Sequence, residues 1–100
     1  MPKYVTLFNF TEKGAQAIKD MPEATETAIK NFEAVGGKLL GWYLVMGTYD
    51  IVAISECPND EVAATYILSL ASGGLVRTTT LKAFTKDEFY GIVKNIPERD

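Results

Sequence analysis

The chain has 100 residues, enough for a single domain spanning residues 1–100 that buries roughly 60–70% of the surface exposed by the unfolded chain. Its formal net charge is −3 and its Lys and Arg residues are scattered, which argues against a nucleic-acid-binding surface. The apolar runs are too short to cross a bilayer and the first residues hold no signal core. We therefore expect a cytoplasmic protein that binds neither nucleic acid nor membrane.

Histidine is absent and Cys57 is the one cysteine. The lack of histidine excludes a His-based zinc site, a haem with a proximal His and a Ser-His-Asp triad. A single cysteine cannot form an internal disulfide, and we interpret Cys57 as a small buried apolar residue. We expect no metal and no cofactor.

Residues 3–10 (KYVTLFNF) are expected to form the first strand, with Tyr4, Thr6, Phe8 and Phe10 on one face. Both faces are largely apolar. Thr11 is predicted to cap a short helix that turns Ala15 and Ile18 inward, with Phe10 packing on Ala15.

A second helix start follows at residues 20–23, where Asp20 and Glu23 are spaced as a capping box and Pro22 falls in the first turn. Gly36 and Gly37 supply a left-handed end. We expect one long helix with a break near Pro22, whose apolar positions are Ala28, Ile29, Phe32 and Val35.

Residues 39–56 are predicted to form a β-hairpin, because Gly47 and Thr48 suit a two-residue type II′ turn. Neither face of the hairpin is clearly polar, so we expect it to be covered on both sides. The predicted cross-strand pairs are Met46–Tyr49, Val45–Asp50, Leu44–Ile51, Tyr43–Val52, Trp42–Ala53, Gly41–Ile54 and Leu40–Ser55.

Asn59 and Asp60 are predicted to open a helix over residues 61–72 that is apolar nearly all round, which indicates burial on more than one side. The last strand is expected over residues 75–84, with Arg77, Thr79 and Leu81 on one face. Residues 85–88 (TKDE) form a second capping box, which begins a terminal helix with the apolar stripe Ile92, Val93 and Ile96.

This order of elements is the ferredoxin-like βαββαβ pattern, an α+β fold with a four-stranded antiparallel sheet, two helices on one face and an added C-terminal helix. Two helices cover only one face of the sheet. We therefore expect the other face to pack on the same face of a second copy in a two-fold homodimer, with the apolar helix suggesting larger oligomers.

Several motifs resemble those of the GYD-domain family of small bacterial proteins: Gly47-x-Tyr49-Asp50 followed by residues 51–54 (IVAI), Thr11-x-x-Gly14, and residues 76–81 (VRTTTL). The family is similar to the dimeric α/β-barrel group, which includes ligand-sensing domains of amino-acid-responsive regulators. The resemblance implies the dimeric α/β-barrel fold and a ligand-sensing role. It implies no established activity. An Arg often found two positions after the helix proline in this family is replaced here by Ala24.

The candidate ligand-binding residues are Tyr43, Tyr49, Asp50, Arg77 and Thr79, and Gly47, Tyr49 and Asp50 form the turn motif. Asp50 is either a ligand or catalytic carboxylate at the mouth of a cleft or an acceptor for backbone N–H groups, and hairpins favour the second role. Arg77 with Thr79, or Thr78 and Thr80 with Lys82, can hold an anion or form an ordinary solvated strand. Trp42 and Tyr43 point to opposite faces, so one of them can line a cleft between the sheet and a partner subunit, together with Phe8 or Phe84.

We interpret the chain as a non-catalytic domain that binds or senses a small molecule and assembles as a homo-oligomer. The alternatives are a cofactor-free enzyme acting on a small substrate, aromatic ones included, with Asp50 or a Tyr transferring protons, and a protein whose assembly is itself the function.

Overall fold

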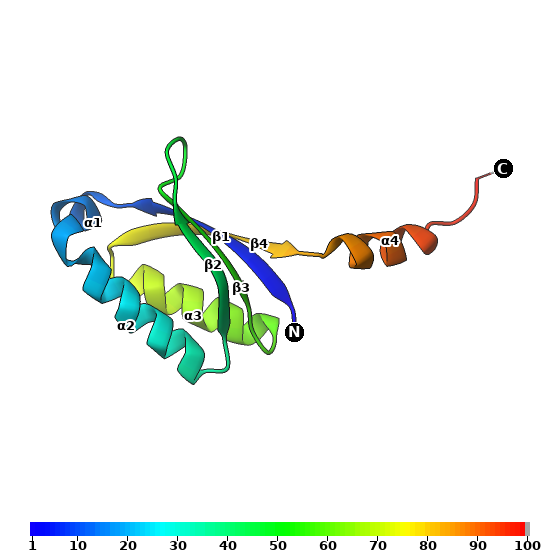
Figure 1. Cartoon of the computed structure of the whole chain (residues 1–100), viewed down its shortest axis with the longest axis horizontal. Coiled ribbons are helices and arrows are strands. Elements are labelled where there is room, and N and C mark those ends of the chain that lie inside the picture. The colour runs from blue at the N-terminus through cyan, green and yellow to red at the C-terminus, as the bar shows by residue number, and fades with distance from the viewer. Residues whose placement is uncertain (100) are drawn as a thin grey trace.

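The fold is a four-stranded antiparallel sheet with the strand order β2-β3-β1-β4, seen in a computed structural model that describes residues 1–99 (Figure 1). Asp100 lies outside the described residues. The arrangement is ferredoxin-like α+β and confirms the predicted fold class. The elements are β1 (Lys3–Phe10), α1 (Glu12–Gln16), η1 (Ile18–Asp20), α2 (Met21–Ala34), β2 (Lys38–Leu44), β3 (Ile51–Glu56), α3 (Asp60–Ser72), β4 (Val76–Ala83) and α4 (Lys86–Lys94).

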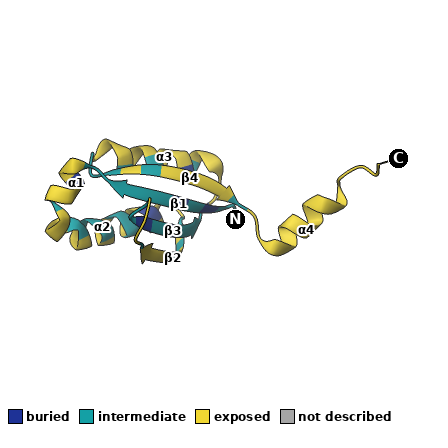
Figure 2. Cartoon of the chain, turned by 90° about the horizontal axis from the view of Figure 1, so that it is seen from above, coloured by how far each residue is buried: buried dark blue, intermediate teal, exposed yellow. Residues whose placement is uncertain are grey.

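Helices α2 and α3 cover one face of the sheet and leave the other face bare (Figures 1 and 2). The core under the helices is small. Tyr4 from β1 packs there with Phe32, Cys57 and Ala63, and Ile51 and Ala53 of β3 are also buried on this side. The alternation of a strand then places Val5 and Leu7 on the bare face.

The hairpin register is confirmed from Gly41–Ile54 to Leu44–Ile51. Beyond Gly41 the prediction is wrong, because a β-bulge shifts the ladder and pairs Leu39, not Leu40, with Ser55. The loop is also wider than a two-residue turn. Its last cross-strand bond runs from the Val45 N–H to the Asp50 carbonyl oxygen at 2.8 Å, and Gly47 has the positive φ expected of it, +148°.

Helix α1 begins as predicted but faces the sheet differently. The Thr11 Oγ1 accepts from the Gly14 N–H at 3.1 Å, so the cap is confirmed. The inward orientation of Ala15 and Ile18 is wrong, because Gly14 is the buried residue. A Cβ on Gly14 would lie 2.0 Å from the Leu75 carbonyl oxygen, so glycine is what lets α1 lie against the start of β4.

The break before Pro22 is real, but the capping box predicted at Asp20 is not. A 3₁₀ turn, η1, runs directly into α2 and leaves Asp20 with helical dihedral angles, φ −91° and ψ −6°. A capping residue needs an extended backbone to bring its side chain over the first free N–H groups. Asp20 accordingly makes no capping hydrogen bond.

The caps of the later helices are as predicted. Asn59 Oδ1 accepts from the Val62 N–H at 2.8 Å, and Thr85 and Glu88 form a complete capping box. Two apolar surfaces stay uncovered, however. Leu68 of α3 is 71% exposed, and α4 projects away from the body with every residue exposed (Figure 2).

The close approach at Gly14 makes a clear stability prediction. Gly14→Ala should lower the free energy of unfolding by about 1–3 kcal/mol, because the methyl group forces α1 away from β4. The measurement is urea denaturation. Gly91→Ala is the matched control: nothing lies within 4 Å of its Cβ position, so it should not destabilise the chain. Equal effects of the two substitutions would contradict this account.

Candidate binding site

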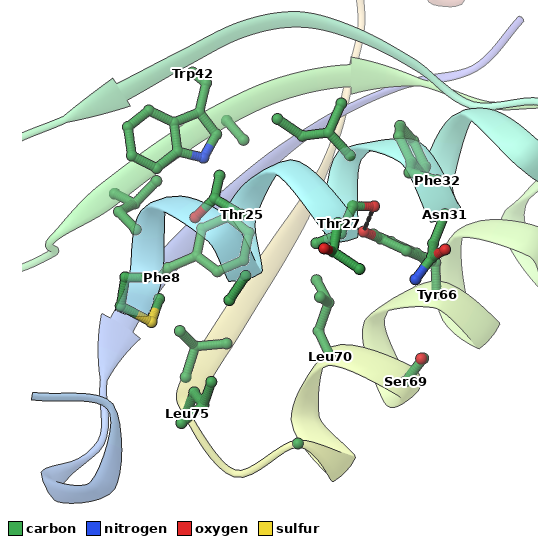
Figure 3. A pocket seen from close by; sticks show the side chains of 18 of the residues that line it. Phe8, Thr25, Thr27, Asn31, Phe32, Trp42, Tyr66, Ser69, Leu70 and Leu75 are labelled. Carbon is green, nitrogen blue, oxygen red and sulfur yellow. Dashed lines mark hydrogen bonds between the residues drawn. The ribbon is translucent and has the colours of Figure 1, made fainter. Parts of the chain in front are cut away.

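A groove of about 550 Å³ lies between α2, α3 and the helix-facing side of the sheet (Figure 3). Its floor is apolar and includes Phe8, Trp42 and Ile51. Ala24 and Leu70 are among the residues of its helical walls. A groove of this volume and character is within the range of ligand sites and of surfaces that receive a helix.

Tyr66 of α3 sets the spacing of the two helices. Its ring centroid lies 4.8 Å from that of Phe32, and its hydroxyl donates to the Ala28 carbonyl oxygen on α2. Burial raises the pKa of the Tyr66 hydroxyl, which therefore stays a donor at neutral pH. A bulky bridge between α2 and α3, with small side chains at Ala24 and Ala28, keeps the groove open.

None of the five predicted ligand-binding residues lines this groove. Tyr43, Arg77 and Thr79 lie on the bare face of the sheet instead, as the strand alternation requires. Tyr43 and Thr79 are in one cross-strand row, but three strand spacings of about 4.8 Å put them about 14 Å apart.

The aromatic residues considered for a cleft against a partner subunit divide between the two faces of the sheet. Trp42 and Phe8 both line the groove, whereas Tyr43 is on the other face of the sheet. Phe84 follows β4, is 58% exposed and does not contribute.

Two roles were considered for Asp50, and its geometry matches the structural one. Its Oδ2 accepts from the Phe10 N–H at 2.9 Å, and its own N–H donates to the Phe8 carbonyl oxygen at 2.8 Å. The backbone partner is on β1 rather than in the turn itself. Asn9 adds a third link, since its Nδ2 donates to the Thr48 carbonyl oxygen at 2.8 Å. The half-buried Tyr49 lies between these anchors, so this stretch clamps the hairpin loop to the end of β1.

A polar cluster that sequence reasoning missed joins α3 to the sheet. The Tyr4 hydroxyl donates to Asp60 Oδ1, and Lys82 Nζ lies 3.1 Å from Asp60 Oδ2. Burial, followed by this hydrogen bond, raises the pKa of Tyr4 well above its usual range. The bond from Tyr4 and then the one from Lys82 lower the pKa of Asp60. Tyr4 and Lys82 are cross-strand partners, so the β1–β4 register is the signal that leads to this cluster.

Cys57 is fully buried beside Tyr4, and burial raises the pKa of its thiol. This is the packing role predicted for it. Among residues 1–99, no three Cys, Asp or Glu side chains gather closely enough to bind a metal ion. Over the same residues, no helix has both the length and the apolarity of a membrane span.

Comparison with known proteins shows which family this chain is related to. The family model described as GYD domain matches residues 4–93. A protein of Thermus thermophilus, the "Glutamine synthetase and cystathionine beta-lyase binding protein", is 33% identical over 84 residues, which cover 83% of this chain and 88% of the relative. The chain belongs to the GYD domain family, as its motifs indicated.

The clamp at Asp50 can be tested by stability. Asp50→Ala leaves the Phe10 N–H without its acceptor and should lower the free energy of unfolding by roughly 1–3 kcal/mol in urea denaturation. Tyr49→Phe removes a neighbouring polar atom that makes no hydrogen bond within residues 1–99, and should unfold like the unsubstituted chain. If Asp50→Ala were neutral, the clamp would be wrong.

The lowered pKa of Asp60 predicts a pH dependence. A carboxyl group whose pKa is lower in the folded chain stabilises it above the unfolded pKa, and this stabilisation is lost as the pH falls through the folded pKa. Below about pH 4, the melting temperature of the unsubstituted chain should therefore approach that of Asp60→Asn. Glu61→Gln, which removes an adjacent carboxylate without such bonds in residues 1–99, should leave the pH profile unchanged. A constant gap between the unsubstituted chain and Asp60→Asn at all pH values would refute this prediction.

Proposed function

We propose that this chain is a non-catalytic binding module that assembles as a homo-oligomer and whose partner is another protein. The observation that carries the proposal is its relative, which is named for binding two enzymes and aligns over most of both chains. Glutamine synthetase and cystathionine beta-lyase are therefore the first partners to test.

The bare face of the sheet supports the assembly part of the proposal. Its central residues come from all four strands and are Val5, Leu7, Tyr43, Val52, Ile54 and Leu81. Tyr43 is 60% exposed and Leu81 49% exposed in one copy. An apolar surface of this kind is typical of an interface, and a two-fold axis lets the same residues of two copies meet.

Small-molecule binding is a second candidate function, and the groove between α2 and α3 is the observation that favours it. Its volume of about 550 Å³ is of the size that small ligands occupy, and its lining is mainly apolar. The enzyme alternative has less support, because the carboxylate of Asp50 accepts a backbone hydrogen bond and does not line the groove.

The homo-oligomer can be tested with two neighbouring threonines of β4 that face opposite ways. Thr79→Asp places a charge on the bare face and should reduce the mass measured by sedimentation equilibrium, because a buried unpaired charge is costly. Thr80→Asp, on the helix side, is the matched control and should keep the original mass. A monomeric mass for the unsubstituted chain at micromolar concentration would refute the assembly.

Partner binding is tested with the two enzymes from the organism that encodes this chain. The immobilised chain should bind purified glutamine synthetase or cystathionine beta-lyase in biolayer interferometry, and an unrelated enzyme of similar size and charge should give no signal. Failure of both enzymes to bind would contradict the proposed partners. Native mass spectrometry of the chain alone tests the second candidate, since a bound small molecule appears as extra mass lost on denaturation.

A further inference from the structure

Helix α4 carries an apolar stripe with nothing from its own chain packed on it. Phe89, Ile92 and Val93 of α4 recur at positions i, i+3 and i+4, Ile96 follows at i+7 just past the end of the helix at Lys94, and each is at least 44% exposed. A helix of nine residues with an interior glycine, Gly91, has little stability of its own in water. The stripe and the short length together indicate that α4 is helical because another surface covers it.

That surface is not the groove of its own chain. Phe84 and Thr85 alone connect β4 with α4, and the capping box at Thr85 fixes the direction in which the helix leaves. The groove is lined by Leu75 and Val76, at the opposite end of β4. The eight residues of β4 span about 26 Å. The nine residues of α4 reach about 14 Å, which is less than the length of β4 that separates α4 from the groove.

We propose that α4 of one copy docks in the groove between α2 and α3 of a second copy. Amphipathic helices bind apolar grooves through anchors at i, i+3, i+4 and i+7, which is the spacing of the stripe. The groove has the complementary form, with Phe8, Trp42 and Leu70 among its apolar lining residues. The docked helix becomes a third helix beside α2 and α3.

Charge favours the groove over the bare sheet face. Lys86, Tyr90 and Lys94 form a row at i, i+4 and i+8 along one flank of the stripe, with Lys86 Nζ 6.0 Å from the Tyr90 ring centroid. The groove carries two carboxylates, Asp20 and Glu23, near the start of α2. Opposite charges beside an apolar contact orient a partner.

Among residues 1–99, no comparable pair of unpaired carboxylates lies at the end of the bare face that holds Glu56. There Glu56 is already paired with Lys3, whose Nζ lies 3.1 Å from Glu56 Oε2. Docking of α4 and binding of a small molecule are two different uses of the groove, and they lead to different experimental results.

Disulfide trapping between two full-length chains tests the proposal. One chain carries Ile92→Cys and a second chain, with a mass tag, carries Ala24→Cys. The two chains are co-expressed, purified and then oxidised. The natural Cys57 is fully buried and does not compete. The mixed disulfide between the two chains should form in several-fold higher yield than when Val52→Cys, on the bare face, replaces Ala24→Cys. Circular dichroism confirms that each variant is folded.

Each other result overturns the docking. A higher yield with Val52→Cys would place α4 on the sheet face. Equal low yields, with or without extra ligand mass in native mass spectrometry, would leave the groove to another occupant.

A pair of single charge substitutions gives an independent measurement. Ile92→Asp, in the stripe, should reduce the mass in sedimentation equilibrium, whereas Asn95→Asp, outside the stripe, should not. An unchanged mass for Ile92→Asp would also overturn the proposal. The sheet-face dimer is tested separately by Thr79→Asp, so failure of one interface is distinguishable from failure of the other.

Discussion

The structure depends on one constraint: both faces of the sheet are apolar, but one layer of helices covers only one of them. Strand β1 shows the constraint most directly, since it lies between β3 and β4 and places Tyr4 and Thr6 under the helices and Val5 and Leu7 on the opposite side. A strand that is apolar on both faces requires a cover on both. The homo-oligomer and the protein partner proposed above would each supply the second cover from another molecule.

Features fixed by residues close together in the sequence could be predicted. The caps at Thr11, Asn59 and Thr85 each bond a backbone N–H three residues ahead, and the central pairs of the hairpin follow from the alternation of its strands. Asp20 has an equally good capping sequence but fails, because η1 holds its backbone in a helical conformation. Sequence rules for capping do not include the preceding turn.

Features fixed by distant segments could not be predicted. Gly14 is buried because Leu75, which is distant in the sequence, packs against it. The groove exists because Tyr66 of α3 reaches across to α2. Strand alternation places Arg77 with Thr79 and the hairpin places Tyr43 near Asp50, but long-range strand pairing puts Tyr43 and Thr79 at opposite edges of the sheet. Residue type identifies what a side chain can bind, and only the tertiary arrangement determines which side chains act together.

The β-bulge between Leu39 and Gly41 affects more than the register of the hairpin. It lies on β2, an edge strand, whose free N–H and C=O groups would otherwise be a template for a strand from another molecule. A bulge bends the edge and increases its twist, so a straight strand pairs with it poorly. Growth of the sheet into a continuous ribbon needs pairing at both edges, β2 and β4, and the bulge on β2 discourages it.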